Sequence, residues 1–205
     1  MFKIDFKKEL KHLYTASSKT FQVIDVPVMQ FLMIDGHGDP NTAKEYKDAL
    51  ETIYPVAYKL KFLSKSRDRD YVVPPLEGLW WADDMAAFTS RAKDEWDWTI
   101  MLMVPDWISS KDFTSSVAKL KAEKNLPAIE KLRFEKYKEG LSVQKLHIGS
   151  YDDEAESLAF LHEQWLPENG YKETGKHHEI YISDPRRTVP EKLKTILRQP
   201  VAQVS

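Results

Sequence analysis

Apolar residues recur along the chain at two spacings, and these divide it into expected strands and helices. An apolar run over Val28–Ile34 predicts a strand, closed by the glycine-rich turn "GHGDPN". Beyond this turn the apolar residues follow steps of three and four, which predicts an amphipathic helix: Ala43, Tyr46, Leu50, Ile53, Ala57 and Leu60. We expect Asp39 or Asn41 to cap this helix, and we expect Pro55 to kink or break it.

The second half of the chain repeats this order of elements. "QFLMIDGHGDP" resembles "QKLHIGSYDDE", "GLWWADD" resembles "EIYISDP", and "WTIMLMVP" matches "KTILRQPV". The pattern predicts an α+β fold that is a tandem βαββ pseudo-repeat, forming a single domain over 1–205. The first copy covers about 26–106, a helical linker about 107–127 and the second copy about 128–205.

One strand of the second copy carries a carboxylate whose environment decides its role. In "HHEIYISDPRR", alternation places Glu179 and Tyr181 on one strand face and Ile180 and Ile182 on the other. If the isoleucines face the core, Glu179 is simply solvated. If the face of Glu179 lines a cavity, a desolvated carboxylate lies beside a phenol and can bind cations or move protons.

The pseudo-repeat favours the cavity. It pairs Gly78 with Glu179 and Trp80 with Tyr181, and it predicts a central ligand cleft between the two halves. The chain has six Trp, nine Tyr and nine Phe, which supply large apolar surfaces with polar edges. We therefore expect a small aromatic or amphipathic molecule as the partner.

Composition excludes several other classes. The 205-residue chain has a formal net charge of −2 and no cysteine, so it has no disulfides, thiolate metal sites or cysteine nucleophiles. It lacks a basic face for nucleic acid and an apolar run for a membrane span or signal peptide, so we expect neither partner, and a cytoplasmic location. His177 and His178 are adjacent and point to opposite strand faces, so we expect no metal, and no cofactor is indicated. The oligomeric state is not indicated either.

Four segments together resemble the GyrI-like small-molecule-binding family, in a stand-alone form: "DVPVMQFLMIDGHGDPN", "YVVPPLEGLWW", "EGLSVQKLHIGSYDDE" and "HHEIYISDPRRTVPEKLKTILRQPV". The superfamily includes the effector-binding halves of multidrug regulators and the SOUL haem-binding fold. The resemblance implies the tandem βαββ fold, and it implies that Glu179 lies deep in an aromatic pocket. The first 26 residues are too short for a helix-turn-helix, so we do not expect direct transcriptional regulation.

A branch of the stand-alone members hydrolyses the cyclopropane ring of DNA-alkylating natural products, which implies a catalytic base at Glu179. Glu77 and Tyr137 are further candidates for proton transfer. The candidates for substrate binding are Trp80, Trp81, Tyr181, Gly78 and Tyr71.

Three functions remain open at this point. The first is a hydrolase that opens reactive cyclopropanoid genotoxins and so protects the cell. The second is non-catalytic sequestration of amphipathic or cationic drugs. The third is a protein interaction like that of the gyrase inhibitors in the family. A second proton-handling group facing Glu179 would separate the first two.

Overall fold

A computed structural model describes residues 3–83 and 92–204. The chain forms two compact units, neither of which is continuous in sequence. Unit 1 comprises Met1–Glu9 and Met29–Tyr137, and unit 2 comprises Leu10–Val28 and Lys138–Ser205. Within the described part of the chain, no helix has the length and apolar character that crossing a membrane requires.

Unit 1 is built on an antiparallel sheet with the strand order β5-β6-β3-β7. Its strands and helices are β1 (Lys3–Ile4), α1 (Phe6–Glu9), β3 (Met29–His37), α3 (Lys44–Lys65), β4 (Asp70–Tyr71), β5 (Leu76–Trp81), β6 (Asp97–Val104), α5 (Ser110–Glu123) and β7 (Arg133–Tyr137), with short 3-10 turns at Lys93–Glu95 and Ile129–Lys131. The short strands β1 and β4 pair in parallel as a separate two-stranded sheet.

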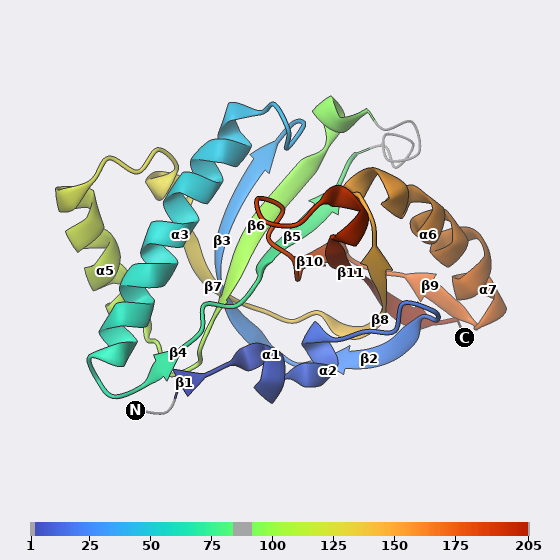
Figure 1. Ribbon diagram of the computed structural model, residues 1–205, viewed down its shortest axis with the longest axis horizontal. Helices are drawn as coiled ribbons and strands as arrows, with labels where there is room; N and C mark the ends of the chain where they lie inside the picture. Colours follow the sequence, from blue (N-terminus) through green and yellow to red (C-terminus); the bar gives the residue numbers. More distant parts are fainter. Residues whose placement is uncertain (1–2, 84–91, 205) are drawn as a thin grey trace. The chain divides into compact units, whose positions relative to one another are not determined.

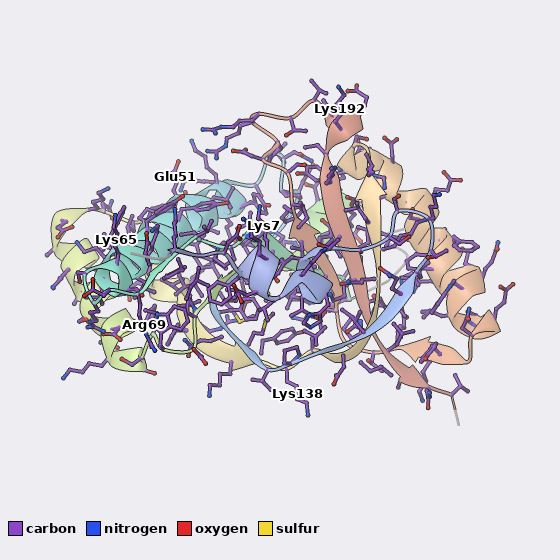
Figure 2. All side chains as sticks on the ribbon, turned by 60° about the horizontal axis from the view of Figure 1, so that its bottom comes forward. Lys7, Glu51, Lys65, Arg69, Lys138 and Lys192 are labelled. Carbon is purple, nitrogen blue, oxygen red and sulfur yellow. The ribbon has the colours of Figure 1, made fainter. Side chains whose placement is uncertain are left out.

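Helix α3 covers one face of this sheet and lies beside α5 (Figure 1). Its inner face buries Ile53, Val56 and Leu60 completely, whereas charged side chains such as Glu51 and Lys65 project to solvent (Figure 2). The amphipathic pattern therefore predicted the buried side of the helix correctly.

The expected caps of this helix are wrong, and so is the expected break at Pro55, whereas the expected kink there stays a prediction. The residue that caps α3 is Ala43, which makes no side-chain hydrogen bond. The Asp39 carboxylate instead accepts hydrogen bonds from the backbone and side-chain amides of Asn41, so both residues are used in the preceding turn. The helix also continues through Pro55 as one element. Buried contacts on both sides of Pro55, at Ile53 and Val56, hold the two parts in one helix.

A glycine lets the helix-covered face of unit 1 hold a tryptophan. Gly36 on β3 lies opposite Trp98 on β6, and the Trp98 ring lies directly over Gly36, where a Cβ atom would collide with it. The indole nitrogen of Trp98 donates to the Gly38 carbonyl at 3.2 Å. Tyr46 of α3 meets this ring edge-to-face, with 5.2 Å between centroids.

Unit 2 has a corresponding antiparallel sheet with the order β2-β8-β11-β10, and β9 pairs with the far end of β11. Its strands and helices are α2 (Lys11–Tyr14), β2 (Gln22–Val26), β8 (Gly140–Ile148), α6 (Glu154–Phe160), a π-helical turn (Leu161–Trp165), α7 (Leu166–Glu168), β9 (Tyr171–Glu173), β10 (His177–Tyr181) and β11 (Lys194–Gln203), with 3-10 turns at Tyr151–Asp153 and Pro190–Lys192. Both units thus connect strand, helix, strand and strand in the same order. In unit 1 the last strand of this series, β6, pairs with β5 and β3. In unit 2 the last strand, β11, pairs with β10 and β8.

The helical segment of unit 2, drawn in orange in Figure 1, packs on one face of its sheet. Val143 of β8 and Val201 of β11 are buried with Leu161 and Leu166 of the helical segment and with Phe21, and Trp165 and Tyr171 pack against them. The rings of Trp165 and Tyr171 are stacked, with 6.0 Å between centroids and 7° between planes. This cluster fixes the helical segment over β8 and β11.

The opposite face of the unit 2 sheet holds a buried charged network centred on Arg198. Its guanidinium donates to the Gln144 side chain at 3.0 and 3.1 Å, to Glu139 at 3.1 Å and to the Leu13 carbonyl at 2.6 Å. Glu139 also contacts Nδ1 of His178 at 2.9 Å. The side chains of Arg198, Glu139 and His178 are only 1–2% exposed. Burial acts to raise the pKa of Glu139, but the charges and hydrogen bonds of His178 and then Arg198 hold it at about 2.

The first prediction concerns this network. Glu139→Gln leaves Arg198 and His178 buried without their counter-ion, so we expect it to destabilise the fold by roughly 3–5 kcal/mol at pH 7. The folded-state pKa lies below the unfolded one, so the stabilisation by Glu139 is present above about pH 4.5 and is lost as the pH falls toward 2. Urea denaturation at pH 7 and pH 3 measures both effects. The matched control is the exposed Glu191→Gln, and an equal cost in both variants would contradict the prediction.

Candidate functional site

Alternation along β10 separates two sets of side chains. His178 and Ile180 are fully buried on the face of the Arg198 network. His177, Glu179 and Tyr181 point to the other face, the one that the helical segment of unit 2 covers. The predicted alternation of the strand is therefore correct, and so is the expectation that the two adjacent histidines diverge.

Glu179 is not a solvated strand glutamate within unit 2. Its side chain is 14% exposed, and its Oε2 atom accepts a hydrogen bond from the Tyr181 hydroxyl at 2.7 Å. Nε2 of His177 lies 3.6 Å from Oε1 of Glu179. The His177 side chain is 10% exposed, and neither ring nitrogen makes a hydrogen bond to the residues that the structure describes. These groups retain polar capacity for a bound molecule.

A second carboxyl group, Glu154, faces Glu179 from the start of α6. Glu154 is 4% exposed, and its side chain approaches those of Glu179 and Thr195. Burial, followed by the negative charge of Glu179, raises the pKa of Glu154 well above its usual value. Two carboxyl groups therefore meet in a largely desolvated place, an arrangement that can hold or transfer a proton.

The aromatic surroundings of this pair come from Tyr151 and Tyr181. Their rings meet edge-to-face at 5.7 Å between centroids. Burial raises the pKa of Tyr151 to about 12, with further contributions from the charges of Glu154, Glu179 and Asp184. Tyr151 therefore keeps its phenolic proton across the physiological pH range.

Sequence reasoning did not find Glu154 or Tyr151. In "GSYDDEAES" the acidic residues are explained by a helix start, where carboxylates are favourable. The structure assigns that role to Asp153, whose carboxylate accepts from the Ser150 backbone and hydroxyl at 3.2 and 2.7 Å. Glu154, one residue further on, turns inward instead. The periodic pattern of apolar residues does not show which of several adjacent acidic residues at a helix start turns inward.

Four further residues that the sequence suggested for the site lie on strand β5 of unit 1. Gly78 and Trp80 point to the face covered by α3, where the Trp80 ring stacks on Tyr46 at 6.3 Å. Glu77 is completely buried on the opposite face, and Trp81 is half-buried on that face. Trp80 is 4% exposed, so packing in unit 1 accounts for much of its surface.

Tyr71 and Tyr137 lie in other parts of unit 1. Tyr71 on β4 is buried between Phe6 and Trp107, at 6.3 and 6.2 Å between ring centroids. Tyr137 ends β7 and meets Phe31 edge-to-face at 6.4 Å. The roles of these two residues in ligand binding or proton transfer stay predictions, as do those of Glu77, Gly78, Trp80 and Trp81.

Metal binding finds no support in the side chains. Across residues 3–83 and 92–204, no group of three or more histidine, aspartate or glutamate side chains is arranged to hold a metal ion.

The fold is that of a family of small-molecule-binding domains. The family model described as the GyrI-like small molecule binding domain matches residues 19–202. The chain belongs to this GyrI-like family. A comparison with curated proteins found no match to the sequence.

Solved structures support the same assignment. An uncharacterized conserved protein from Listeria innocua is 38% identical, with a TM-score of 0.90, over 98% of this chain and 100% of that one. A hydrolase from Listeria innocua is also 38% identical over the same shares, with a TM-score of 0.84. The C-terminal domain of EcmrR shares the fold alone, at 15% identity and a TM-score of 0.58, over 90% of this chain and 98% of that one.

The second prediction follows from the burial of Glu154. Its folded-state pKa is raised, so the unfolded chain releases this proton first and the folded state loses stability as the pH rises above about 4.5. Glu154→Gln removes the titration. We expect the variant to gain stability over the wild type by roughly 1 kcal/mol per pH unit between pH 5 and the folded-state pKa.

Urea denaturation at pH 5, 6, 7 and 8 checks this expectation. The exposed Glu156→Gln, two residues away on the same helix, is the matched control and should show no such trend. A constant difference between Glu154→Gln and the wild type across this range would show that Glu154 does not retain its proton.

Proposed function

We propose that the protein is a hydrolase that adds water to reactive cyclopropanoid molecules, opening the strained ring and protecting the cell from alkylation. The observation that carries the proposal is the desolvated Glu179 carboxylate, held by the Tyr181 hydroxyl and faced by a second carboxyl group. A hydrolase from Listeria innocua with 38% identity over 98% of this chain supports hydrolytic chemistry.

The proposed step balances without a cofactor. Glu179 accepts a proton from water while the water oxygen forms a bond to the cyclopropane carbon. The carbon–carbon bond of the ring breaks, and its electron pair moves into the conjugated dienone to give a phenolate. That oxygen then takes a proton from solvent or from the protonated glutamate. The reactant is already electrophilic, so the protein needs to supply mainly orientation and an activated water.

His177 is the residue proposed to help place the water. Its Nε2 lies 3.6 Å from Oε1 of Glu179, a separation at which one water bridges two polar groups. Tyr181 would hold the other oxygen of the carboxylate. Glu179 would then be fixed on one side and face the water on the other.

The aromatic candidates from the sequence have the chemistry to bind a flat substrate. We propose that Trp80 contributes stacking surface, with Gly78 leaving room beside it on the same face of β5. Trp81 lies on the opposite face of the strand and would provide an alternative stacking surface there. Tyr71 and Tyr137 remain weaker proposals, because ring contacts within unit 1 already account for them. Glu77 remains a weaker proposal because it lies on the face of β5 opposite Trp80.

The third prediction tests the base. Glu179→Gln preserves the shape of the side chain but cannot accept the proton of water, so we expect hydrolysis of a spirocyclopropyl dienone to fall by about 10²–10⁴-fold. Product formation followed by mass spectrometry measures this loss. Affinity for a neutral aromatic ligand should change little, because the amide still forms hydrogen bonds. Glu156→Gln is the control, and unchanged turnover in Glu179→Gln would exclude Glu179 as the base.

The fourth prediction concerns Tyr181. Tyr181→Phe keeps the ring contact with Tyr151 but removes the donor to Glu179. A hydrogen bond to a charged group contributes about 1.5–3 kcal/mol, so we expect turnover to fall by roughly 10–100-fold. The exposed Tyr58→Phe is the control. Equal turnover in these two variants would show that the Tyr181 hydroxyl does not contribute to turnover.

A second function is favoured by the same two carboxyl groups. Glu154 and Glu179 together would attract a cationic amphipathic drug, which the protein would sequester without turnover. In that case Glu179→Gln weakens cationic ligands most, and neither the wild type nor the variant forms a ring-opened product. The mass-spectrometric assay therefore distinguishes the two functions.

A further inference from the structure

The inner carboxyl group of unit 2, Glu154, is buried with one of its two oxygens unsatisfied among the described residues. Its Oε1 atom is inaccessible to solvent and has no hydrogen-bond partner among the residues that the structure describes. The Thr195 hydroxyl lies beside the same carboxyl group and acts to lower the pKa of Glu154, but burial and the charge of Glu179 raise it by more. An ionised carboxylate in this place would be costly, whereas a protonated one supplies the missing donor itself.

The contact with Glu179 adds a second reason for a proton. Two carboxylates that meet in a desolvated site repel each other, and they titrate as a pair in which one proton is held to high pH. Glu179 has the Tyr181 hydroxyl at 2.7 Å and His177 at 3.6 Å to stabilise a charge. Among the described residues, Glu154 has only the Thr195 hydroxyl beside it to favour its charged form, and its Oε1 atom is buried without a partner. The asymmetry of the surroundings therefore places the proton on Glu154.

We propose that Glu154 stays protonated at neutral pH and donates a hydrogen bond to Glu179, so that the pair carries a single negative charge. Glu154 is then a positioning residue. Its hydroxyl and that of Tyr181 hold the Glu179 carboxylate from two sides, and they keep it correctly turned. A site with one negative charge suits a neutral or singly charged molecule and disfavours a divalent cation.

Other titratable groups lie near the pair of Glu154 and Glu179, and an experiment has to distinguish their protonation from that of the pair. They are Tyr151, Tyr181, His177, Asp152 and Asp184. Tyr151, with its pKa raised to about 12, stays protonated below pH 10. His147 on the neighbouring strand is engaged with the Ser150 carbonyl at 2.9 Å. The proton on Glu154 is therefore best observed directly at the carboxyl carbon.

The first experiment does not require turnover. Glutamate labelled with ¹³C at the side-chain carboxyl is incorporated into the full-length protein, and the carboxyl signals are followed by NMR between pH 5 and 9. We expect one signal to keep the chemical shift of a protonated acid through pH 7. That signal should be absent from Glu154→Gln and present in Glu156→Gln.

The second experiment rests on the proposed hydrolysis. With a spirocyclopropyl dienone as the probe, kcat/KM of the wild type should fall at alkaline pH, as Glu154 loses its proton and repels Glu179. Glu154→Gln keeps a donor that does not titrate, so its alkaline decline should disappear. Glu154→Leu has no donor, and we expect a loss of roughly 10–100-fold across the pH range, larger than the loss in Glu154→Gln. The alkaline decline should persist in Tyr181→Phe and in His177→Gln.

The results separate this inference from the proposed function. If all carboxyl signals are ionised by pH 7, or if the protonated signal remains in Glu154→Gln, the inference is wrong even for a protein that hydrolyses the probe. If the protonated signal is lost in Glu154→Gln but no variant or wild type hydrolyses any cyclopropanoid, the charge assignment holds and the hydrolase proposal fails.

Discussion

The buried guanidinium of Arg198 is the constraint on which unit 2 depends. A fully desolvated arginine needs an acceptor for nearly every N–H group, and here they come from Glu139, Gln144 and the Leu13 carbonyl. These acceptors belong to three separate stretches of the chain. Satisfying one side chain therefore fixes the α2 segment, the turn before β8 and the register of β8 against β11. Gln144 extends the constraint, because its amide donates to the backbone carbonyls of His12 and Thr15 at 2.9 and 3.3 Å.

The same constraint aligns the candidate site on the opposite face of the sheet. His178 is paired with Arg198 across β10 and β11, so the next residues along each strand, Glu179 and Leu197, are also paired. A slip of one residue would move Glu179 and Tyr181 to the face of Arg198. The network on one face thus specifies which side chains meet Glu154 and Thr195 on the other.

Periodic patterns in the sequence predicted the elements well and their polar details poorly. Alternation predicted correctly that His178 points to one face of β10 and that His177 and Glu179 point to the other, because a strand period of two leaves no freedom of assignment. The caps of α3 were not predictable, since Asp39 and Asn41 serve equally well in a turn. Arg198 and Glu154 were also missed, because isolated charged residues in a sequence are normally exposed and only tertiary partners show otherwise. The matching of Trp80 with Tyr181 stays a prediction, although each residue lies on the helix-covered face of its own sheet.

The sequence separation within the Arg198 network has a consequence for synthesis of the protein on the ribosome. Leu13 is made 185 residues before its partner Arg198. At about 5–20 residues per second, the α2 segment waits on the order of 10–40 s for this partner. Strand β2 likewise waits for β8, to which it pairs between Gln22 and Gln144. Most of unit 1, from Met29 to Tyr137, is complete by then. Unit 2 closes only after Arg198 is made, so until then the nascent chain exposes the early apolar segments of this unit, which makes them points of contact for chaperones.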